Sequence, residues 1–247
     1  MQLSKVIDSI GLTISPSAWN YRKKMDVDQE AAKKGQAVYS PRVLKIYDKW
    51  VLGFSNSLIW RCPTTKIRQL FTDHLSSNHL DIGVGTGYFL DKCATDPESR
   101  IGLVDMNENA LKYASKRLAR FNPETYKRNV TEPLLLACDN YDSVSINYLF
   151  HCLPGDIEIK GELFDEVNGY LNDDGVVFGA TLLSQDIERP AAARMLMKYY
   201  NEKGIFSNEF DSLGDLMSAM STRYRTFNVE VIGCAVLFWG KGPKRKV

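Results

Sequence analysis

Residues 79–90 have the sequence HLDIGVGTGYFL, which predicts a short apolar strand, a glycine-rich turn and the first turn of a helix. Such a junction points backbone N–H groups and a helix N-terminus at a ligand. Gly83, Gly85 and Gly87 permit positive φ angles and let a ligand approach the backbone without meeting a Cβ atom. The dinucleotide fingerprint G-x-G-x-x-G would need its third glycine where Tyr88 stands. The spacing therefore disfavours a dinucleotide as the ligand.

Two carboxylates accompany these glycines at the ends of predicted strands. Asp81 comes two residues before Gly83, and Asp105 ends the strand predicted at 100–105, 18 residues after Gly87. A carboxylate repels a pyrophosphate but attracts a ligand with cationic groups. An acidic residue at the end of the second strand is typical of a ribose-binding position. The alternative for Asp105 is that it caps the helix predicted at 107–121.

The acidic residue followed by alternating glycines resembles motif I of the class I S-adenosylmethionine (SAM)-dependent methyltransferases. The segments YDKWVLGFSN (47–56), WRCPT (60–64), NYLFHCLPG (147–155) and GVVFGATLL (175–183) resemble bacterial and fungal members found around secondary metabolism. The resemblance covers roughly residues 39–240. It implies that Asp81 and the three glycines hold the methionine end of SAM. It also implies that Asp105 holds the ribose and that Met106 packs on the adenine.

Other candidate residues follow from their places at strand ends. Asn129 and Val130 end the third predicted strand, where the resemblance implies adenine binding, although an asparagine there also suits a turn and Asp139 is a rival. Asn147 ends the central strand, at the edge where open α/β sheets bind ligands. His151 lies just beyond it and is the candidate general base, with pocket lining as its alternative role.

Aromatic residues of the flanking helical segments are candidates for the acceptor pocket, with core packing as the alternative. They are Tyr39, Tyr47, Trp60 and Tyr200. His74 and His79 flank the first strand and are expected at the surface, and Cys152 is expected to be a small buried side chain.

Composition narrows the classes of partner. The 247 residues are 44% hydrophobic and carry a formal net charge of +1, which suits one sizeable core and gives no field for nucleic acid or membrane binding. The chain shows no apolar run of membrane-spanning length, so a cytoplasmic protein is expected. The five cysteines are scattered without a C-x-x-C pair, which supports neither disulfides nor zinc, and no carboxylate cluster suggests another metal.

These patterns predict an α/β fold, with a seven-stranded doubly wound sheet, an antiparallel edge hairpin and an N-terminal helical cap. Residues 1–38 are expected to form a lead-in or lid, 39–240 the SAM-dependent methyltransferase domain, and 241–247 a short basic tail. Helices are predicted at 64–74, 156–171, 190–203 and 212–221, and a tight turn at 172–175.

The predicted function is methyl transfer from SAM to an oxygen, nitrogen or sulfur of a small molecule, by a monomer or homodimer. Three alternatives stay open. They are a nucleic-acid methyltransferase, which the balanced charge disfavours, an NAD-linked oxidoreductase, and a SAM-binding relative that catalyses a rearrangement or only binds ligand.

Overall fold

The computed structural model describes residues 48–244. Its seven-stranded sheet has the order β3-β2-β1-β4-β5-β7-β6. Five strands are parallel, and β7 runs antiparallel to both β5 and β6. The strands are β1 Asn78–Ile82, β2 Arg100–Asp105, β3 Glu124–Lys127, β4 Tyr141–Asn147, β5 Leu171–Leu182, β6 Tyr224–Ile232 and β7 Ala235–Pro243. The predicted fold class is confirmed.

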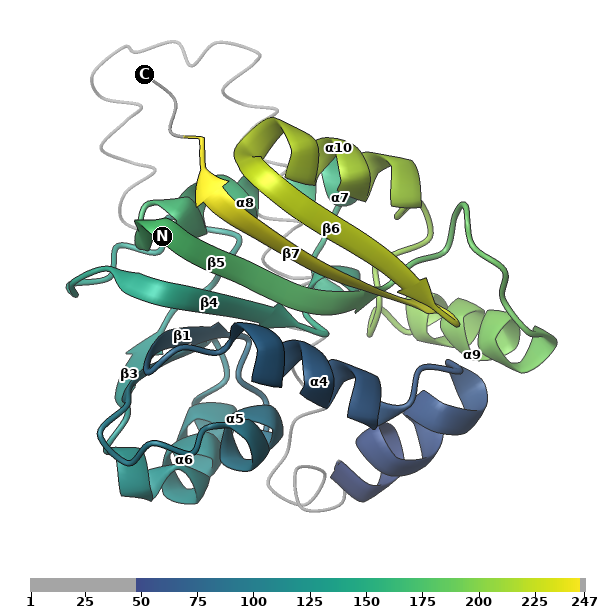
Figure 1. The fold of residues 1–247 in the computed structure, drawn as a ribbon. Helices are drawn as coiled ribbons and strands as arrows, with labels where there is room; N and C mark the ends of the chain where they lie inside the picture. The colour runs from purple at the N-terminus through teal and green to yellow at the C-terminus, as the bar shows by residue number, and fades with distance from the viewer. Residues whose placement is uncertain (1–47, 245–247) are drawn as a thin grey trace, which may run out of the picture.

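Helices cover both faces of this sheet (Figure 1). The helical segments are η1 Asp48–Ile59, α4 Thr64–His74, α5 Tyr88–Cys93, α6 Glu108–Arg117, η2 Ala119–Phe121, η3 Phe150–Cys152, α7 Ile157–Lys160, α8 Glu162–Asn168, α9 Ala191–Glu202 and α10 Leu213–Arg223. One core cluster unites η1, α4, α5, α6 and α9 with the sheet, and the other unites α7, α8 and α10 with it. None of the helices within 48–244 is long and apolar enough to cross a bilayer.

Side chains alternate between these two cores along β1 and β4. Leu80 pairs in register with Val144, and Ile82 with Ile146, and all four belong to the core beneath α7, α8 and α10. The residues between them point to the opposite face because successive side chains of a strand alternate. That face therefore receives a polar row at the centre of the sheet, composed of His79, Asp81, Ser143 and Ser145.

Several predicted boundaries differ from the structure. The helix expected at 156–171 divides into α7 and α8 at Gly161, where a Cβ would lie 2.9 Å from the carbonyl oxygen of Ile157 and 3.3 Å from Ala219 of α10. The turn expected at 172–175 lies within β5, whose pairing with β4 shifts between Tyr141 and Ser143. Helix α6 ends at Arg117 rather than near Phe121, and β3 ends at Lys127, before Asn129. Strand β7 includes the first residues assigned to the tail, because Lys241 pairs with Val176.

Candidate active site

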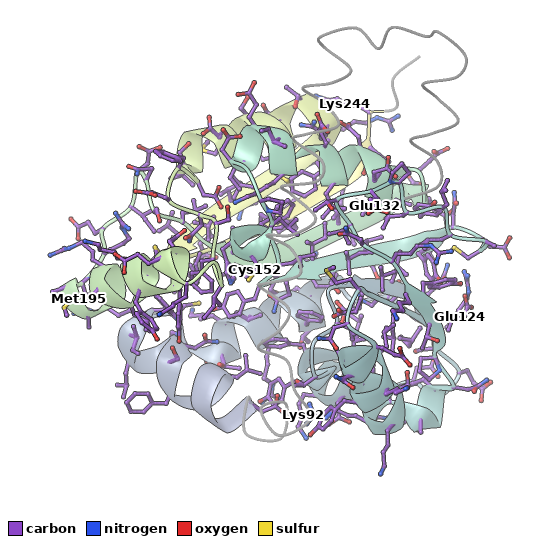
Figure 2. The ribbon with its side chains drawn as sticks, turned by 180° about the vertical axis from the view of Figure 1, so that it is seen from behind. Lys92, Glu124, Glu132, Cys152, Met195 and Lys244 are labelled. Atoms are coloured by element: carbon purple, nitrogen blue, oxygen red, sulfur yellow. The ribbon has the colours of Figure 1, made fainter. Side chains whose placement is uncertain are left out.

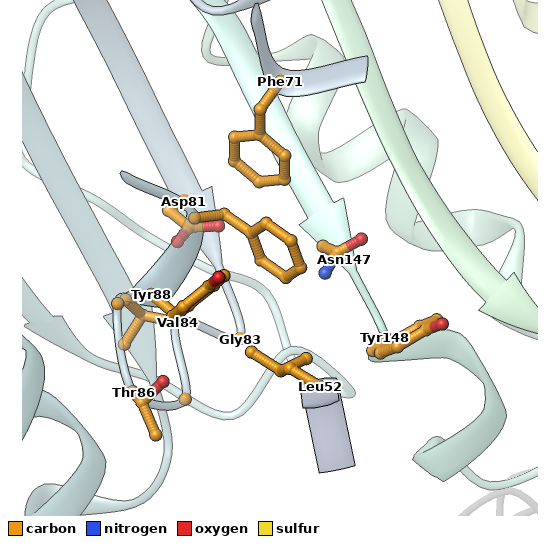
Figure 3. A pocket seen from close by; sticks show the side chains of 12 residues that line it. Leu52, Phe71, Asp81, Gly83, Val84, Thr86, Tyr88, Asn147 and Tyr148 are labelled. Atoms are coloured by element: carbon orange, nitrogen blue, oxygen red, sulfur yellow. The ribbon is translucent and has the colours of Figure 1, made fainter. Parts of the chain in front are cut away.

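A pocket lies at the carboxyl ends of β1 and β4, neighbouring strands from which the chain proceeds to opposite sides of the sheet. Open α/β sheets bind ligands at such a position. Figure 3 shows Asp81 at the end of β1 and Asn147 at the end of β4 around this space. The lining residues are Leu52, Phe71, Asp81, Gly83, Val84, Gly85, Thr86, Gly87, Tyr88, Phe89, Asn147 and Tyr148.

The glycine turn forms one wall of the pocket. Gly83, Gly85 and Gly87 have φ angles of 75°, 53° and 68°, in the left-handed region that favours glycine. A Cβ at Gly83 would approach Leu149 to 3.1 Å, whereas a Cβ at Gly85 would meet nothing within 4 Å in the described part of the chain. Gly85 is therefore the glycine that leaves room for a ligand.

Two polar side chains reach the pocket from the strand ends. The carboxyl of Asp81 is 6% exposed and lies 2.5 Å from the Ser145 hydroxyl. Burial raises the pKa of Asp81 to about 7, against the opposing effect of the Ser145 hydrogen bond. The side-chain oxygen of Asn147 is buried and has no hydrogen-bond partner among residues 48–244. A cationic donor placed here would satisfy both groups.

Asp105 lies at the carboxyl end of β2, the strand that pairs with β1. Its carboxylate accepts hydrogen bonds from the backbone N–H of Asn107 at 2.8 Å and of Gly85 at 3.3 Å. Burial raises its pKa to about 6. The cap of α6 is the Asn107 side chain, which accepts from Asn109 and Ala110, so the capping alternative for Asp105 is wrong. The half-buried Met106 follows it directly.

Asn129 and Val130 lie beyond the end of β3. The Asn129 oxygen accepts hydrogen bonds from the backbone and hydroxyl of Thr131, and its amide nitrogen donates to Glu132. Val130 packs against the core beneath α7 and α8. Neither residue lines the pocket described above, and the same is true of Asp105 and Met106.

An ionic clamp joins the glycine turn to η1 and α6. Asp48 accepts a 2.6 Å hydrogen bond from the Thr86 hydroxyl and forms a 2.6 Å ion pair with Arg117. Arg117 also donates to the Thr86 carbonyl oxygen at 3.0 Å. These contacts fix the turn against the helical segment that supplies Leu52 to the pocket.

Aromatic rings gather beside the Asn147 end of the pocket. The ring of His151 lies 5.6 Å from Tyr148 and 4.5 Å from Phe206, and Phe206 also contacts Trp60 and Tyr200. Tyr148 has a φ of 55°, an unusual value for a bulky residue, immediately after β4. We call Tyr148, His151, Phe206, Trp60 and Tyr200 the aromatic cluster. Figure 2 shows Cys152 near the middle of the molecule and the exposed Met195 of α9 at its periphery.

His151 is buried, at 4% exposure, within this cluster. Burial, together with the charge of Lys160, lowers its pKa to about 3. Its Nδ1 atom lies 3.4 Å from both the Thr181 hydroxyl and the Leu182 backbone nitrogen. The imidazole is thus uncharged near neutral pH.

Comparison with known proteins places this site in a family. Residues 80–177 match a family described as "Methyltransferase domain". A physcion biosynthesis cluster O-methyltransferase of Aspergillus chevalieri is 38% identical over 86% of this chain and 96% of its own length. The chain belongs to the class I SAM-dependent methyltransferases.

Two further comparisons agree with this assignment. A demethylluteothin O-methyltransferase of Streptomyces thioluteus is 40% identical over 84% of the chain and 90% of its own length. The solved structure described as a DhpI–SAH complex covers 87% of the chain and 98% of its own, with a TM-score of 0.61 and 13% sequence identity. That likeness shows the fold of this methyltransferase.

The pocket of the methyltransferase fits SAM, which is its cofactor. The methionine end of SAM carries an ammonium and a sulfonium, and the pocket offers the Asp81 carboxyl and the unpartnered Asn147 oxygen. The open space at Gly85 gives the ligand access to the backbone.

The other predicted residues near the acceptor side have different outcomes. Tyr39 and Tyr47 lie outside the described residues. Trp60 is 3% exposed and belongs to the core, where its ring contacts Phe206. Cys152 is half-buried rather than buried, and burial raises the pKa of its thiol to about 12.

The expectation for His79 is wrong, because this residue is 0% exposed and lies beneath Phe71 and Phe178. The sequence carried a signal for it. In β1 and β4 polar and apolar residues alternate, as HLDI and SVSIN, and the strands pair so that both polar sets share one face. Sequence reasoning also missed Ser145, which contacts Asp81 directly.

Proposed function

We propose that this methyltransferase methylates an oxygen of a small planar molecule, of the kind made in secondary metabolism. The observation that carries the proposal is the aromatic cluster, which adjoins the SAM pocket through Tyr148. Aromatic walls favour flat, largely apolar acceptors. The O-methyltransferase names of the relatives from Aspergillus chevalieri and Streptomyces thioluteus support oxygen over nitrogen or sulfur.

In this proposal the ends of different strands bind different parts of SAM. Asp81 and Asn147 bind the ammonium of the methionine end, and the glycine turn lies along it. Asp105 accepts hydrogen bonds from the ribose through the remaining lone pairs of its carboxylate. The adenine of SAM is bound farther along the same edge of the sheet, by Met106, Asn129 and Val130.

The proposed methyl transfer depends more on positioning of the acceptor than on general acid–base catalysis. SAM supplies a methyl group that its sulfonium makes electrophilic. The aromatic cluster then holds the acceptor in line and excludes water, and such alignment supplies much of the acceleration of a two-reactant step. A pKa of about 3 makes His151 a weak general base near neutral pH, so we assign it to the wall of the acceptor site.

Replacing His151 distinguishes a role as general base from a role as a wall of the acceptor site. His151→Phe keeps a ring against Phe206 but removes both imidazole nitrogens, whereas His151→Ala removes the ring as well. For a wall residue we expect His151→Phe to keep kcat within about threefold and His151→Ala to raise the acceptor KM about tenfold. Steady-state kinetics measures both. A loss of kcat of about a hundredfold in both variants would instead restore His151 as the base.

Removing the Asp105 carboxylate tests the ribose position. Asp105→Ala is expected to weaken SAM binding by about 1–3 kcal/mol, because the ribose hydroxyls lose their acceptor. Calorimetric titration with SAM and with its demethylated product S-adenosylhomocysteine measures the change. The control is Asp139→Ala, at the exposed rival position, which should bind as tightly as the unmodified protein. An equal loss of SAM affinity in both variants would show that Asp105 does not bind the ribose.

The reaction itself is tested by incubating the protein with SAM and a panel of phenols, amines and thiols. Mass spectrometry then records which acceptors gain one methyl group. The proposal expects transfer to hydroxyl groups of flat aromatic compounds. Transfer confined to amines or thiols would contradict the oxygen assignment, and SAM binding with turnover but no methylation would favour the rearrangement alternative.

A further inference from the structure

A row of buried hydrogen bonds leads from the Asp81 carboxyl to the amino end of β1. Asp81 Oδ1 lies 2.5 Å from Ser145 Oγ, which lies 2.9 Å from His79 Nε2. On the other side of the ring, His79 Nδ1 lies 2.7 Å from Ser143 Oγ, which lies 2.7 Å from Ser76 Oγ. We call Asp81, Ser145, His79, Ser143 and Ser76 the relay.

The relay is closed to solvent except at its outer end. Ser143, Ser145 and His79 are 0% exposed, and Phe71 and Phe178 lie over the imidazole at ring distances of 6.5 and 5.7 Å. Ser76 is half-buried and its neighbour Ser77 is exposed. One end of the relay therefore borders the SAM pocket and the other end approaches water on the opposite edge of the sheet.

The available protons can satisfy every hydrogen bond of the relay in two ways. Each hydroxyl has one proton, and a neutral imidazole has one N–H donor and one acceptor nitrogen. When Asp81 is ionised, Ser145 donates to it, His79 donates from Nε2 to Ser145, Ser143 donates to His79 Nδ1, and Ser76 donates to Ser143. When Asp81 is protonated, every donor is reversed and His79 carries its proton on Nδ1. Ser76 then donates to the Asn78 carbonyl oxygen, 2.8 Å away.

We propose that His79 is a positioning residue whose tautomer changes with the charge of Asp81, so that the relay carries a proton between the SAM pocket and the amino end of β1. The inference rests on the proposed binding of the SAM ammonium by Asp81. When Asp81 ionises, its proton passes to Ser145, and Ser145 gives its own proton to His79 Nε2. His79 releases its Nδ1 proton to Ser143, Ser143 protonates Ser76, and Ser76 gives a proton to water. No bond other than O–H and N–H changes.

The surroundings favour a change of tautomer over a change of charge on the ring. Burial lowers the pKa of His79 to about 3, which keeps it neutral, and raises the pKa of Asp81 to about 7. The neighbouring helices and β5 present Phe71, Phe89 and Phe178 to this face, and His74 of α4 packs its ring on Phe178. Among residues 48–244, the charge of Asp105 at the end of β2 also raises the pKa of Asp81.

The sign of the pH effect follows from the raised pKa. Folding raises the pKa of Asp81 from its ordinary value of 3.8 to about 7, so between these values the folded protein keeps a proton that the unfolded chain loses, and stability falls as the pH rises. A cationic ligand favours the ionised form. Below about pH 7 SAM binding should therefore release about one proton and tighten about tenfold per pH unit, and above about pH 7 it should level off.

Nitrogen NMR of the histidine rings tests the inference in the ligand-free protein. The chain has only three histidines, so ring signals labelled with nitrogen-15 are few, and His79→Gln assigns one set. We expect His79 to carry its proton on Nδ1 at about pH 5.5 and on Nε2 at about pH 8.5, and to stay uncharged throughout. A single tautomer over the whole range, or a charged ring, would overturn the inference.

A variant that cuts the relay sharpens the test. Ser145→Ala removes the hydroxyl between Asp81 and His79, so the tautomer should no longer follow pH. The control is Ser184→Ala, which removes a buried hydroxyl bonded to Met197 outside the relay and should leave the titration unchanged. A His79 tautomer that still follows pH in Ser145→Ala would contradict the coupling.

Adding SAM at about pH 6 separates this inference from the proposed function. The His79 proton should move to Nε2, and calorimetry in buffers of different ionisation enthalpy should record proton release. SAM binding with neither effect would overturn the inference and leave the SAM site intact. Failure of SAM to bind would instead refute the proposed site, and the titration of the ligand-free protein would still decide the coupling.

Discussion

Replacing Lys160 by methionine is expected to lower the free energy of unfolding by about 3–5 kcal/mol, because it leaves a buried carboxylate without its cation. The Lys160 ammonium lies 2.7 Å from both carboxylate oxygens of Asp211, and both side chains are 0% exposed. Denaturation in urea, with the slope compared between variants, measures the loss.

Two controls make this prediction specific to burial. Lys198→Met removes an exposed ion pair with Glu202, whose side chains are 79% and 61% exposed, and should change stability by less than about 0.5 kcal/mol. The double variant Lys160→Met, Asp211→Leu replaces the whole pair by apolar groups and should regain much of the loss. A single variant no less stable than Lys198→Met would show that the pair contributes nothing.

The same pair supports the proposed acceptor side of the site. Lys160 also donates to the Ser207 carbonyl oxygen at 2.6 Å, and the Ser207 backbone N–H donates to the His151 carbonyl oxygen at 2.8 Å. These bonds fix the segment that carries Phe206 into the aromatic cluster. A folded fraction of Lys160→Met should therefore show a raised KM for the acceptor with unchanged SAM affinity.

Local patterns were sufficient to predict the sheet and helix α4. Helix α4 has the predicted bounds Thr64–His74, because Pro63 favours a helix start just after it and the apolar residues Ile67, Leu70 and Phe71 repeat at helical spacing. The glycine turn was also predictable, since an acidic residue and three alternating glycines between an apolar strand and a helix restrict the backbone strongly.

Burial that depends on distant neighbours was not predictable from one segment. His79 looked like a surface residue because it stands next to the polar Asn78, at the start of a short strand. Its burial requires Ser143 and Ser145, 64 and 66 residues away, to satisfy both ring nitrogens. The break at Gly161 likewise depends on Ala219 of α10.

The adenine side of the site was predicted by analogy alone, and the structure shows a competing local role. The Asn129 side chain bonds Thr131 and Glu132 within its own turn, which is the behaviour expected of an asparagine in a loop. Its role in SAM binding stays a prediction. Asp105 differs, because its bond to Gly85 ties it to the turn on which the pocket depends.

Gly85→Ala is expected to weaken SAM binding about a hundredfold, equivalent to about 2.7 kcal/mol, while the protein stays folded. A Cβ at Gly85 would meet no atom of residues 48–244 within 4 Å, so the added methyl occupies the space left for the ligand. The φ of 53° adds backbone strain of about 1–2 kcal/mol to the folded state. Calorimetry measures the affinity, and thermal unfolding without ligand measures the strain.

Gly204→Ala is the matched control for Gly85→Ala, because Gly204 has a φ of 67° and also has no described residue within 4 Å of a Cβ. Gly204 follows α9 and lies outside the pocket. Both variants should lose about the same stability, since an L-residue meets similar strain at each position. Only Gly85→Ala should lose SAM affinity. If the two variants bind SAM equally well, the methionine end of SAM does not lie along the glycine turn, and the roles proposed for Asp81 and Asn147 fail together.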